Sequence, residues 1–325
     1  MSAPIVRIGG FAESEVVSVL NSACAQIGLD PADAVVLHGH TNAVYLLPTA
    51  GVVAKIARAG TALTGVRRTV QLVQWLTNHE FPTAESLPVE QPVIADGHAV
   101  TFWQHLPQPG HPVPAAHLTG PLRTLHELPP PPFDVRPVDT VGAIRRSIAE
   151  TTALPQDDLA FLKNRLAELD DARRRVRYAL APGLLQGDPQ HRNALHHQEA
   201  AVLCDWGSAC FGQPELDLVT VEIHCRRFGY GPAHYQEFAD RYGFDVASWE
   251  GFPVLSGLRE LRMITTNAER AGPSGARRSR RFAGASRVCA PGTTSPAGRL
   301  SSQDCVVGLR RSVRESVRDA KPRAS

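Results

Sequence analysis

The order of apolar and polar residues predicts a small sheet at the start of the chain. Residues 13–27 carry apolar side chains at helical spacing and Gly28 ends the run, so we expect an opening helix. Five short apolar runs follow, and a second helix, at 64–79, interrupts the series. The runs span residues 34–37, 43–47, 52–57, 89–95 and 98–104. Short runs joined by tight turns are typical of an antiparallel meander.

After residue 106 the pattern becomes helical. Four prolines and a glycine forbid regular structure between positions 107 and 114, and we place a lobe boundary there. Beyond it, apolar residues recur every three to four positions, as in Leu159, Leu162 and Leu166. The expected helices span 117–128, 139–150, 157–179, 215–229, 233–242 and 247–265. The expected fold class is α+β, with an N-terminal lobe at 1–106 and a larger, mainly helical lobe at 107–270.

The overall composition is typical of a soluble protein with an ordinary core. The chain has 325 residues, of which 43% are hydrophobic. No run approaches the roughly 18 apolar residues of a membrane span, and the N-terminus lacks a charged start followed by a long apolar segment. We therefore expect a cytoplasmic protein without a membrane partner. Six scattered cysteines without C-x-x-C spacing favour reduced, mostly buried thiols over a disulfide framework or a zinc site.

Residues 271–325 differ from the rest in charge and composition. They hold eleven Arg and one Lys against three acidic residues, which gives a net charge of +9. Because the whole chain carries +2, the first 270 residues carry a net charge of −7. Rich in Arg, Ser, Gly and Pro, this tail is expected to be disordered, either as a basic extension or as the product of a shifted reading frame. An acidic body attracts cationic small molecules and repels nucleic acid, so the pI of 8.3 does not indicate DNA binding.

Three polar residues between 184 and 218 carry the candidate chemistry. Residues that break regular structure flank Asp188 and leave its carboxylate on a loop. Asn193 lies at the start of a short predicted strand, and Asp205 lies at the end of a second one, at 200–204. Asn193 and Asp205 can therefore converge across a hairpin. Their oxygens suit Mg²⁺, and Asp188 is then free to act as a base toward an attacking hydroxyl. The alternative is a turn with ordinary solvated acids.

Lys55 is a second candidate, on the nucleotide side of such a site. It is one of three lysines in a chain with thirty-one arginines, and it lies inside the apolar run VVAKIA. Burying its charge is costly without an anionic partner such as a nucleotide phosphate. The turn at 38–42 is short and polar, and Gly39 permits close backbone approach to a ligand. Taken alone, Lys55 equally fits a side chain that snorkels at a sheet edge, and the turn fits an ordinary hairpin.

The run QGDPQHRN at 186–193, followed by Asp205-Trp206-Gly207, Gly212 and Asp217, resembles the aminoglycoside phosphotransferase family. The resemblance covers about residues 14–268. It implies a protein-kinase-like two-lobe fold and transfer of the γ-phosphate of ATP or GTP to a hydroxyl of a small molecule, with cationic aminoglycosides among the candidate acceptors. It implies a structural role for Asp217. It also implies Asp188 as catalytic base, Asn193 and Asp205 as Mg²⁺ ligands, and Gly39, Thr41, Asn42 and Lys55 as nucleotide-binding residues.

The chain departs from the family pattern at two places. Gln186 stands where the family has His. In kinase-like folds a glutamate of the helix usually anchors the strand lysine, but Thr69 stands at that position, and the whole predicted helix at 64–79 contains no acidic residue. Two rival functions therefore stay open: a catalytically inactive protein that binds Mg-nucleotide, and an interaction protein that binds polyanions through its basic tail. The motifs G-x-x-x-x-G-K-[ST], G-x-S-x-G and H-E-x-x-H, which mark other enzyme classes, are absent from the sequence.

Overall fold

The computed structural model describes residues 7–8, 11–39, 42–58, 60–152, 154–198, 200–228 and 230–270. These residues form two compact units. The first contains the described residues up to Arg136 together with Gly183–Phe211, and the second contains Pro137–Pro182 with the described residues from Gly212 onward. The lobe boundary at 106–107 stays a prediction, and the expected disordered tail at 271–325 lies outside the described residues. Among the described helices, none is both long and apolar enough to cross a membrane.

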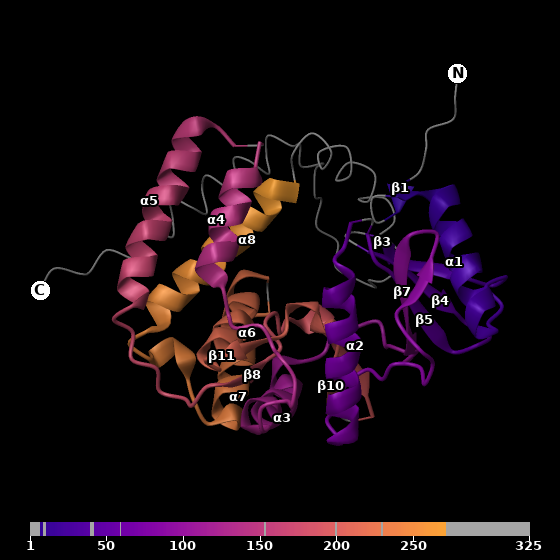
Figure 1. Ribbon diagram of the computed structural model, residues 1–325. Coiled ribbons are helices and arrows are strands. Elements are labelled where there is room, and N and C mark those ends of the chain that lie inside the picture. Colours follow the sequence, from indigo (N-terminus) through magenta and orange to yellow (C-terminus); the bar gives the residue numbers. More distant parts are fainter. Residues whose placement is uncertain are drawn as a thin grey trace, which may run out of the picture. The chain divides into compact units, whose positions relative to one another are not determined.

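The first unit contains an antiparallel sheet of five strands in the order β3-β4-β5-β7-β6. Figure 1 labels β3, β4, β5 and β7 of this sheet. Its strands are β3 (Val35–Gly39), β4 (Ala43–Leu47), β5 (Val52–Ile56), β6 (Val93–Ala95) and β7 (His98–Gln104). They confirm the five predicted apolar runs. The fourth begins at Val93 instead of 89, in keeping with Pro92, which has no N–H to donate to a ladder. Two short strands, β1 (Arg7–Ile8) and β2 (Phe11–Ala12), pair with each other.

Two helices bury their apolar stripes in the first unit. Helix α1 (Glu13–Ile27) contacts β5, β6 and β7, and its side chains share a core with the sheet. That core includes Val16, Leu20, Cys24, Tyr45, Ile56 and Phe102. Helix α2 (Leu63–Asn78) buries Val70, Val73 and Leu76, which recur at the helical period. Both helices were predicted, because periodicity of this kind is readable without the fold.

The remaining elements of the first unit carry the candidate chemistry. They are α3 (Ala115–Glu127), β8 (Gly183–Leu185), the 3₁₀ turn η1 (His191–Asn193), β9 (Ala194–His197), β10 (Ala200–Leu203) and the 3₁₀ turn η2 (Trp206–Ser208). Strands β9 and β10 form the predicted hairpin, with Leu195 opposite Val202. Strand β11 (Cys210–Gly212) pairs with β8. Leu203 accepts a hydrogen bond from the Ala84 N–H (3.1 Å), which ties the hairpin to the segment after α2.

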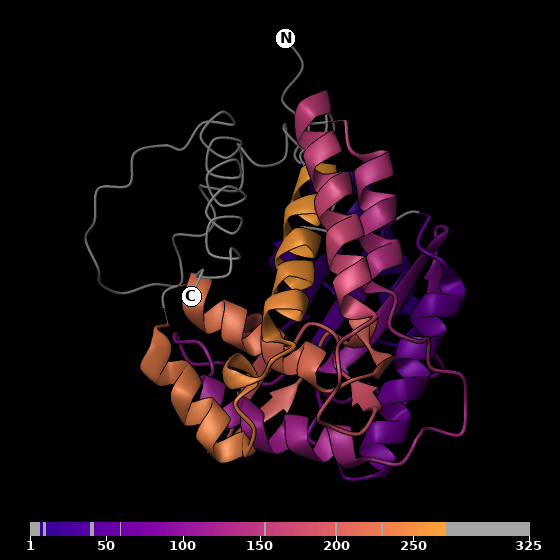
Figure 2. The ribbon, with the colours of Figure 1, turned by 90° about the vertical axis from the view of Figure 1, so that its left-hand side faces the viewer.

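Helices make up the described part of the second unit. They are α4 (Thr140–Glu150), α5 (Gln156–Arg173), α6 (Glu215–Arg227), α7 (Pro232–Tyr242), the 3₁₀ turn η3 (Val246–Ser248) and α8 (Phe252–Arg270). Helix α8 packs against α4, α5 and α6, and Figure 2 shows it in orange beside the pink helices α4 and α5. The helix predicted at 157–179 ends at Arg173, where the chain tightens and the Val176 N–H donates to the Arg173 carbonyl (3.2 Å).

Candidate active site

Asp188 lies on a loop shortly after β8. Gly187 turns the chain there with a φ of 82°, and a Cβ at Gly187 would collide with the carbonyl oxygen of Ser208. The half-buried carboxylate accepts hydrogen bonds from Gln190 Nε2 (2.7 Å) and Asn193 Nδ2 (3.3 Å), both at Oδ2. The two amides thereby fix the orientation of the Asp188 carboxylate.

Gln186, the first departure from the family pattern, is completely buried and connects both sides of the site. Its Nε2 donates to the carbonyl oxygens of Cys204 (3.0 Å) and Asp205 (3.3 Å). Its Oε1 accepts from the backbone N–H of Asp188 (2.7 Å). A side-chain amide both donates and accepts, so one residue satisfies all three backbone groups. The loop is therefore well packed with glutamine at this position.

Asn193 joins the Asp188 loop to the β9–β10 hairpin. Its Nδ2 donates to the backbone carbonyl of Asp188 (2.9 Å), and its own carbonyl accepts from the Cys204 N–H (2.9 Å). With Nδ2 used in this way, the side-chain Oδ1 could serve as an oxygen ligand. Because Cys204 immediately precedes Asp205, the structure brings Asp188, Asn193 and Asp205 into one neighbourhood, as their spacing predicts.

Lys55 and Asp205 form an ion pair of 2.8 Å between Nζ and Oδ1. Strand β5 lies between β4 and β7, with Lys55 opposite Val44 on one side and Thr101 on the other. This central position excludes the alternative of a lysine at a sheet edge. Asp205 lies two residues after the end of β10 and has a φ of 55°, a left-handed conformation that aspartate adopts more readily than most residues.

Thr69, the second departure, leaves Lys55 without a partner from α2. The described helix contains no acidic residue, and Thr69 Oγ1 donates to the carbonyl of Gly65 in its own helix (3.1 Å). Asp205 therefore neutralises Lys55, a task that a helix glutamate performs in most kinase-like folds.

The structure describes part of the predicted nucleotide turn. Gly39 is the last residue of β3 and pairs with Ala43, and Asn42 immediately precedes β4. Thr41 lies outside the described residues. Asn42 and Lys55 line the same cavity, which encloses about 270 Å³ within the first unit. Its walls also include Thr69, Trp103, Phe133, Arg136 and Trp206.

Cys204 sits beside the ion pair without being reactive. Burial raises the pKa of its thiol to about 12, the negative charge of Asp205 adds to this rise, and Lys55 counteracts it. The thiol therefore remains protonated at neutral pH and is a poor nucleophile.

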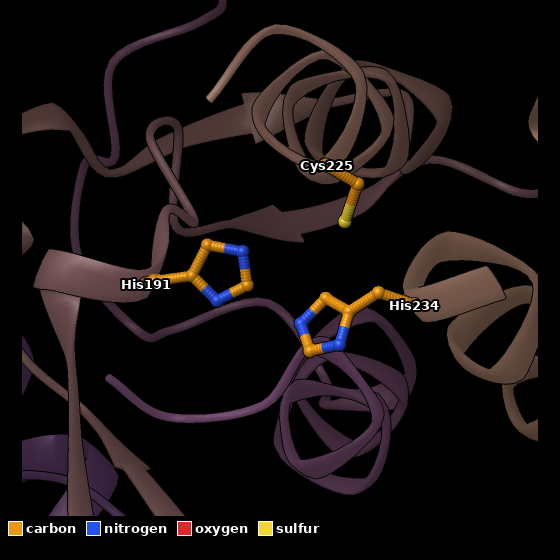
Figure 3. A group of neighbouring side chains, drawn as sticks. All are labelled: His191, Cys225 and His234. Carbon is orange, nitrogen blue, oxygen red and sulfur yellow. The ribbon is translucent and has the colours of Figure 1, made fainter. Parts of the chain in front are cut away.

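Figure 3 shows the side chains of His191, Cys225 and His234. His191 of η1 belongs to the first unit, where its Nδ1 lies 2.7 Å from the carbonyl oxygen of Val113. Cys225 of α6 and His234 of α7 belong to the second unit. Burial, aided by Glu222, raises the pKa of Cys225 to about 12, and burial lowers the pKa of His234 against the opposing charge of Glu237. At neutral pH Cys225 is a protonated thiol and His234 a neutral imidazole.

Sequence reasoning missed one residue of this region and left two others without a role. Arg136 follows a proline-rich segment without periodicity, so no local pattern marks it. Trp103 donates from Nε1 to Thr101 Oγ1 (2.9 Å), and Trp206 donates from Nε1 to Thr83 Oγ1 (2.8 Å). Both tryptophans form walls of the cavity.

A family model described as Phosphotransferase enzyme family (APH) matches residues 34–252, and the chain belongs to this family. The match confirms the resemblance inferred from the loop around Asp188. The search of curated proteins found no match.

Solved structures show the same fold at low sequence identity. Amicoumacin kinase hAmiN, in complex with AMP-PNP, Ca²⁺ and Ami, is 15% identical with a TM-score of 0.66, over 96% of this chain and 95% of that chain. Aminoglycoside phosphotransferase APH(3'')-Id from Streptomyces rimosus is 20% identical with a TM-score of 0.57, over 76% and 98% of the two chains. Choline kinase LicA from Streptococcus pneumoniae is 11% identical with a TM-score of 0.58, over 83% and 98%. These likenesses confirm the predicted α+β, protein-kinase-like fold.

Proposed function

We propose that this protein transfers the γ-phosphate of ATP or GTP to a hydroxyl of a small molecule. The observation that carries the proposal is the joining of the Asp188 loop, Asn193 and the Lys55–Asp205 pair by hydrogen bonds within one unit. Family membership supports it. Solved relatives contain AMP-PNP, GDP or ATP, which supports nucleotide use here.

Asp188 is the proposed base. Its carboxylate is half-buried on a loop, and Gln190 and Asn193 hold Oδ2 from one side. Asp188 would accept the proton of the acceptor hydroxyl as the oxygen attacks the γ-phosphorus, and the nucleoside diphosphate would leave on the opposite side. General-base catalysis of this kind contributes about 10²- to 10⁴-fold in rate.

Asn193 and Asp205 fit a magnesium ion through the chemistry of their donor atoms. The Oδ1 of Asn193 and the carboxylate of Asp205 are hard oxygen ligands, the type that Mg²⁺ prefers. Magnesium, when bound, neutralises charge on the phosphate oxygens of the nucleotide. Asp205 would share its carboxylate between Lys55 and the metal, and Lys55 Nζ would bind phosphate oxygens together with the turn that contains Gly39, Thr41 and Asn42.

The proposed acceptor is a hydroxylated small molecule, and a cationic one is favoured. The first 270 residues carry a net charge of −7, although the whole chain carries +2, and this negative charge attracts cations at long range. Aminoglycosides are one such class, and the solved relatives include aminoglycoside and choline kinases. A cytoplasmic location would supply the nucleotide.

A nucleotide-binding protein without transferase activity is the second candidate. The absence of an acidic residue from α2, with Thr69 bonded inside its own helix, favours it. In that case Lys55 and Asp205 would still bind Mg-nucleotide, and Asp188 would have no acceptor to deprotonate.

The two candidates separate in a comparison of wild type with Asp188→Asn. We expect the variant to bind Mg-nucleotide normally and to lose at least about 100-fold in phosphate transfer, because only the base is removed. Asp171→Asn is the matched control, since Asp171 is an exposed acid of α5 paired with Arg175. Unchanged transfer by Asp188→Asn would rule out Asp188 as the base.

A further inference from the structure

Arg136 holds the loop that follows Asp205 through three hydrogen bonds. Its Nε donates to the carbonyl of Ala209 (3.0 Å) and its Nη2 donates to the carbonyl of Gly207 (2.6 Å). Its own carbonyl accepts from the backbone N–H of Phe211 (2.9 Å). Among the described residues Arg136 forms no ion pair, although it is charged and exposed. Its guanidinium is thus committed to backbone carbonyls of this loop.

The loop needs such support because it starts in an unfavourable conformation. Asp205 has a φ of 55°, which costs a residue other than glycine on the order of 1 kcal/mol. Gly207 lies directly beside its carboxylate, since a Cβ on Gly207 would be 3.6 Å from Asp205 Oδ1. Trp206 anchors the loop at the other side by its bond to Thr83 (2.8 Å). Arg136 therefore holds the backbone two and four residues after Asp205, and it also forms part of the cavity wall.

We infer that Arg136 is a positioning residue that sets the direction of the Asp205 carboxylate for the metal and for Lys55. This inference rests on the proposed function. The planar fork of arginine reaches the carbonyls of Gly207 and Ala209 from two different nitrogens. A lysine has one nitrogen, which cannot reproduce that geometry. Because Arg136 is exposed, its loss changes the direction of the loop more than the stability of the fold.

The test is calorimetric titration of ATP into the full-length protein at a series of Mg²⁺ concentrations. We expect Arg136→Ala to need about 10- to 100-fold more Mg²⁺ for half-maximal nucleotide affinity, the usual cost of removing a group that orients a metal ligand. Arg136→Lys should not restore the affinity. Arg67→Ala is the control, because Arg67 is an exposed arginine of α2 outside the cavity wall.

Two comparisons make the outcome specific. Melting temperatures of Arg136→Ala and Arg67→Ala should agree within a few degrees, which separates positioning from unfolding. In the background of Asp205→Asn, Arg136→Ala should have no further effect on the Mg²⁺ requirement, because the ligand that it orients is already lost. An unchanged Mg²⁺ requirement in Arg136→Ala, or a full further loss in the double variant, would overturn the inference. A folded wild type that binds no Mg-nucleotide would overturn the proposed function, and this role with it.

Discussion

Replacing Asp205 by asparagine should separate the function of the site from its stability. The substitution removes the charge but keeps the size of the side chain. Asparagine also tolerates the left-handed backbone that Asp205 adopts at φ 55°, so the loop can keep its course. Activity should therefore fall without unfolding.

The size of the stability change follows from the geometry of the ion pair. At 2.8 Å the attraction between unit charges is about 1.5 kcal/mol in water and about 6 kcal/mol at an effective dielectric constant of about 20. The side chains of Lys55 and Asp205 are 28% and 52% exposed, so screening by water applies. After desolvation and side-chain ordering, the net contribution is about 1 kcal/mol or less, and the melting temperature should fall by only about 2–4 °C.

The expected change in function is much larger. Loss of a carboxylate ligand should weaken Mg-nucleotide binding by at least about 100-fold, above the range found for groups that only support a ligand. Calorimetric titration of Mg-ATP and Mg-GTP measures the affinity, and thermal unfolding of the same samples measures the stability, with Asp171→Asn as the control. Wild-type affinity in Asp205→Asn would refute the assignment of Asp205 as a metal ligand. A melting temperature lowered by more than about 10 °C would show that the ion pair is structural.

Three further predictions concern stability and reactivity. Glu215 is fully buried and accepts hydrogen bonds from the N–H groups of Ala179 (2.7 Å) and Leu180 (2.9 Å). Urea denaturation should therefore show that Glu215→Ala lowers the free energy of unfolding by about 2–6 kcal/mol and Glu215→Gln by clearly less. Equal losses in the two variants would contradict this prediction. Hydrogen bonds from Thr49 lower the pKa of Asp33, so its contribution to stability is present above its unfolded pKa of about 4 and is lost as pH falls through the lower folded pKa. Wild type should accordingly have a higher melting temperature than Asp33→Asn at pH 7, and the two should converge as pH falls through the lowered folded pKa; a difference that persists in strong acid would contradict the link. Burial raises the pKa of Cys24 to about 11 and those of Cys204 and Cys225 to about 12, so peptide mapping should find all three unmodified after iodoacetamide treatment of folded protein at pH 8. Rapid modification of these cysteines in the folded protein would contradict this prediction.

The local parts of the fold and of the site could be predicted from the sequence. The five strands and the two helices of the sheet region follow from apolar periodicity, which needs no tertiary information. Asp188 and Asn193 are five residues apart, so turn chemistry alone places them together. The ion pair between Lys55 and Asp205, 150 residues apart, was not predicted; the family resemblance assigned Lys55 to the nucleotide and Asp205 to the metal separately.

What could not be predicted depends on contacts between distant segments. Arg136 meets Gly207 and Ala209 across more than 70 residues, and neither segment has a periodic pattern. Gln186 looks like a damaging departure in the sequence, yet its amide bonds to three backbone groups that only the folded loops bring together. Likewise, the grouping of Gly183–Phe211 with the N-terminal part in one compact unit is a property of the packing.

The central claim is that Lys55, Asn193, Asp205 and Asp188 form one Mg-nucleotide phosphotransfer site. The most direct test is calorimetric titration of Mg-ATP and Mg-GTP into wild type, Lys55→Ala and Asp188→Asn, each shown to be folded. We predict saturable binding by wild type, its loss in Lys55→Ala, and its retention in Asp188→Asn, because Lys55 binds phosphate and Asp188 only accepts a proton. Absence of binding by folded wild type, or equal binding by Lys55→Ala, would contradict the account.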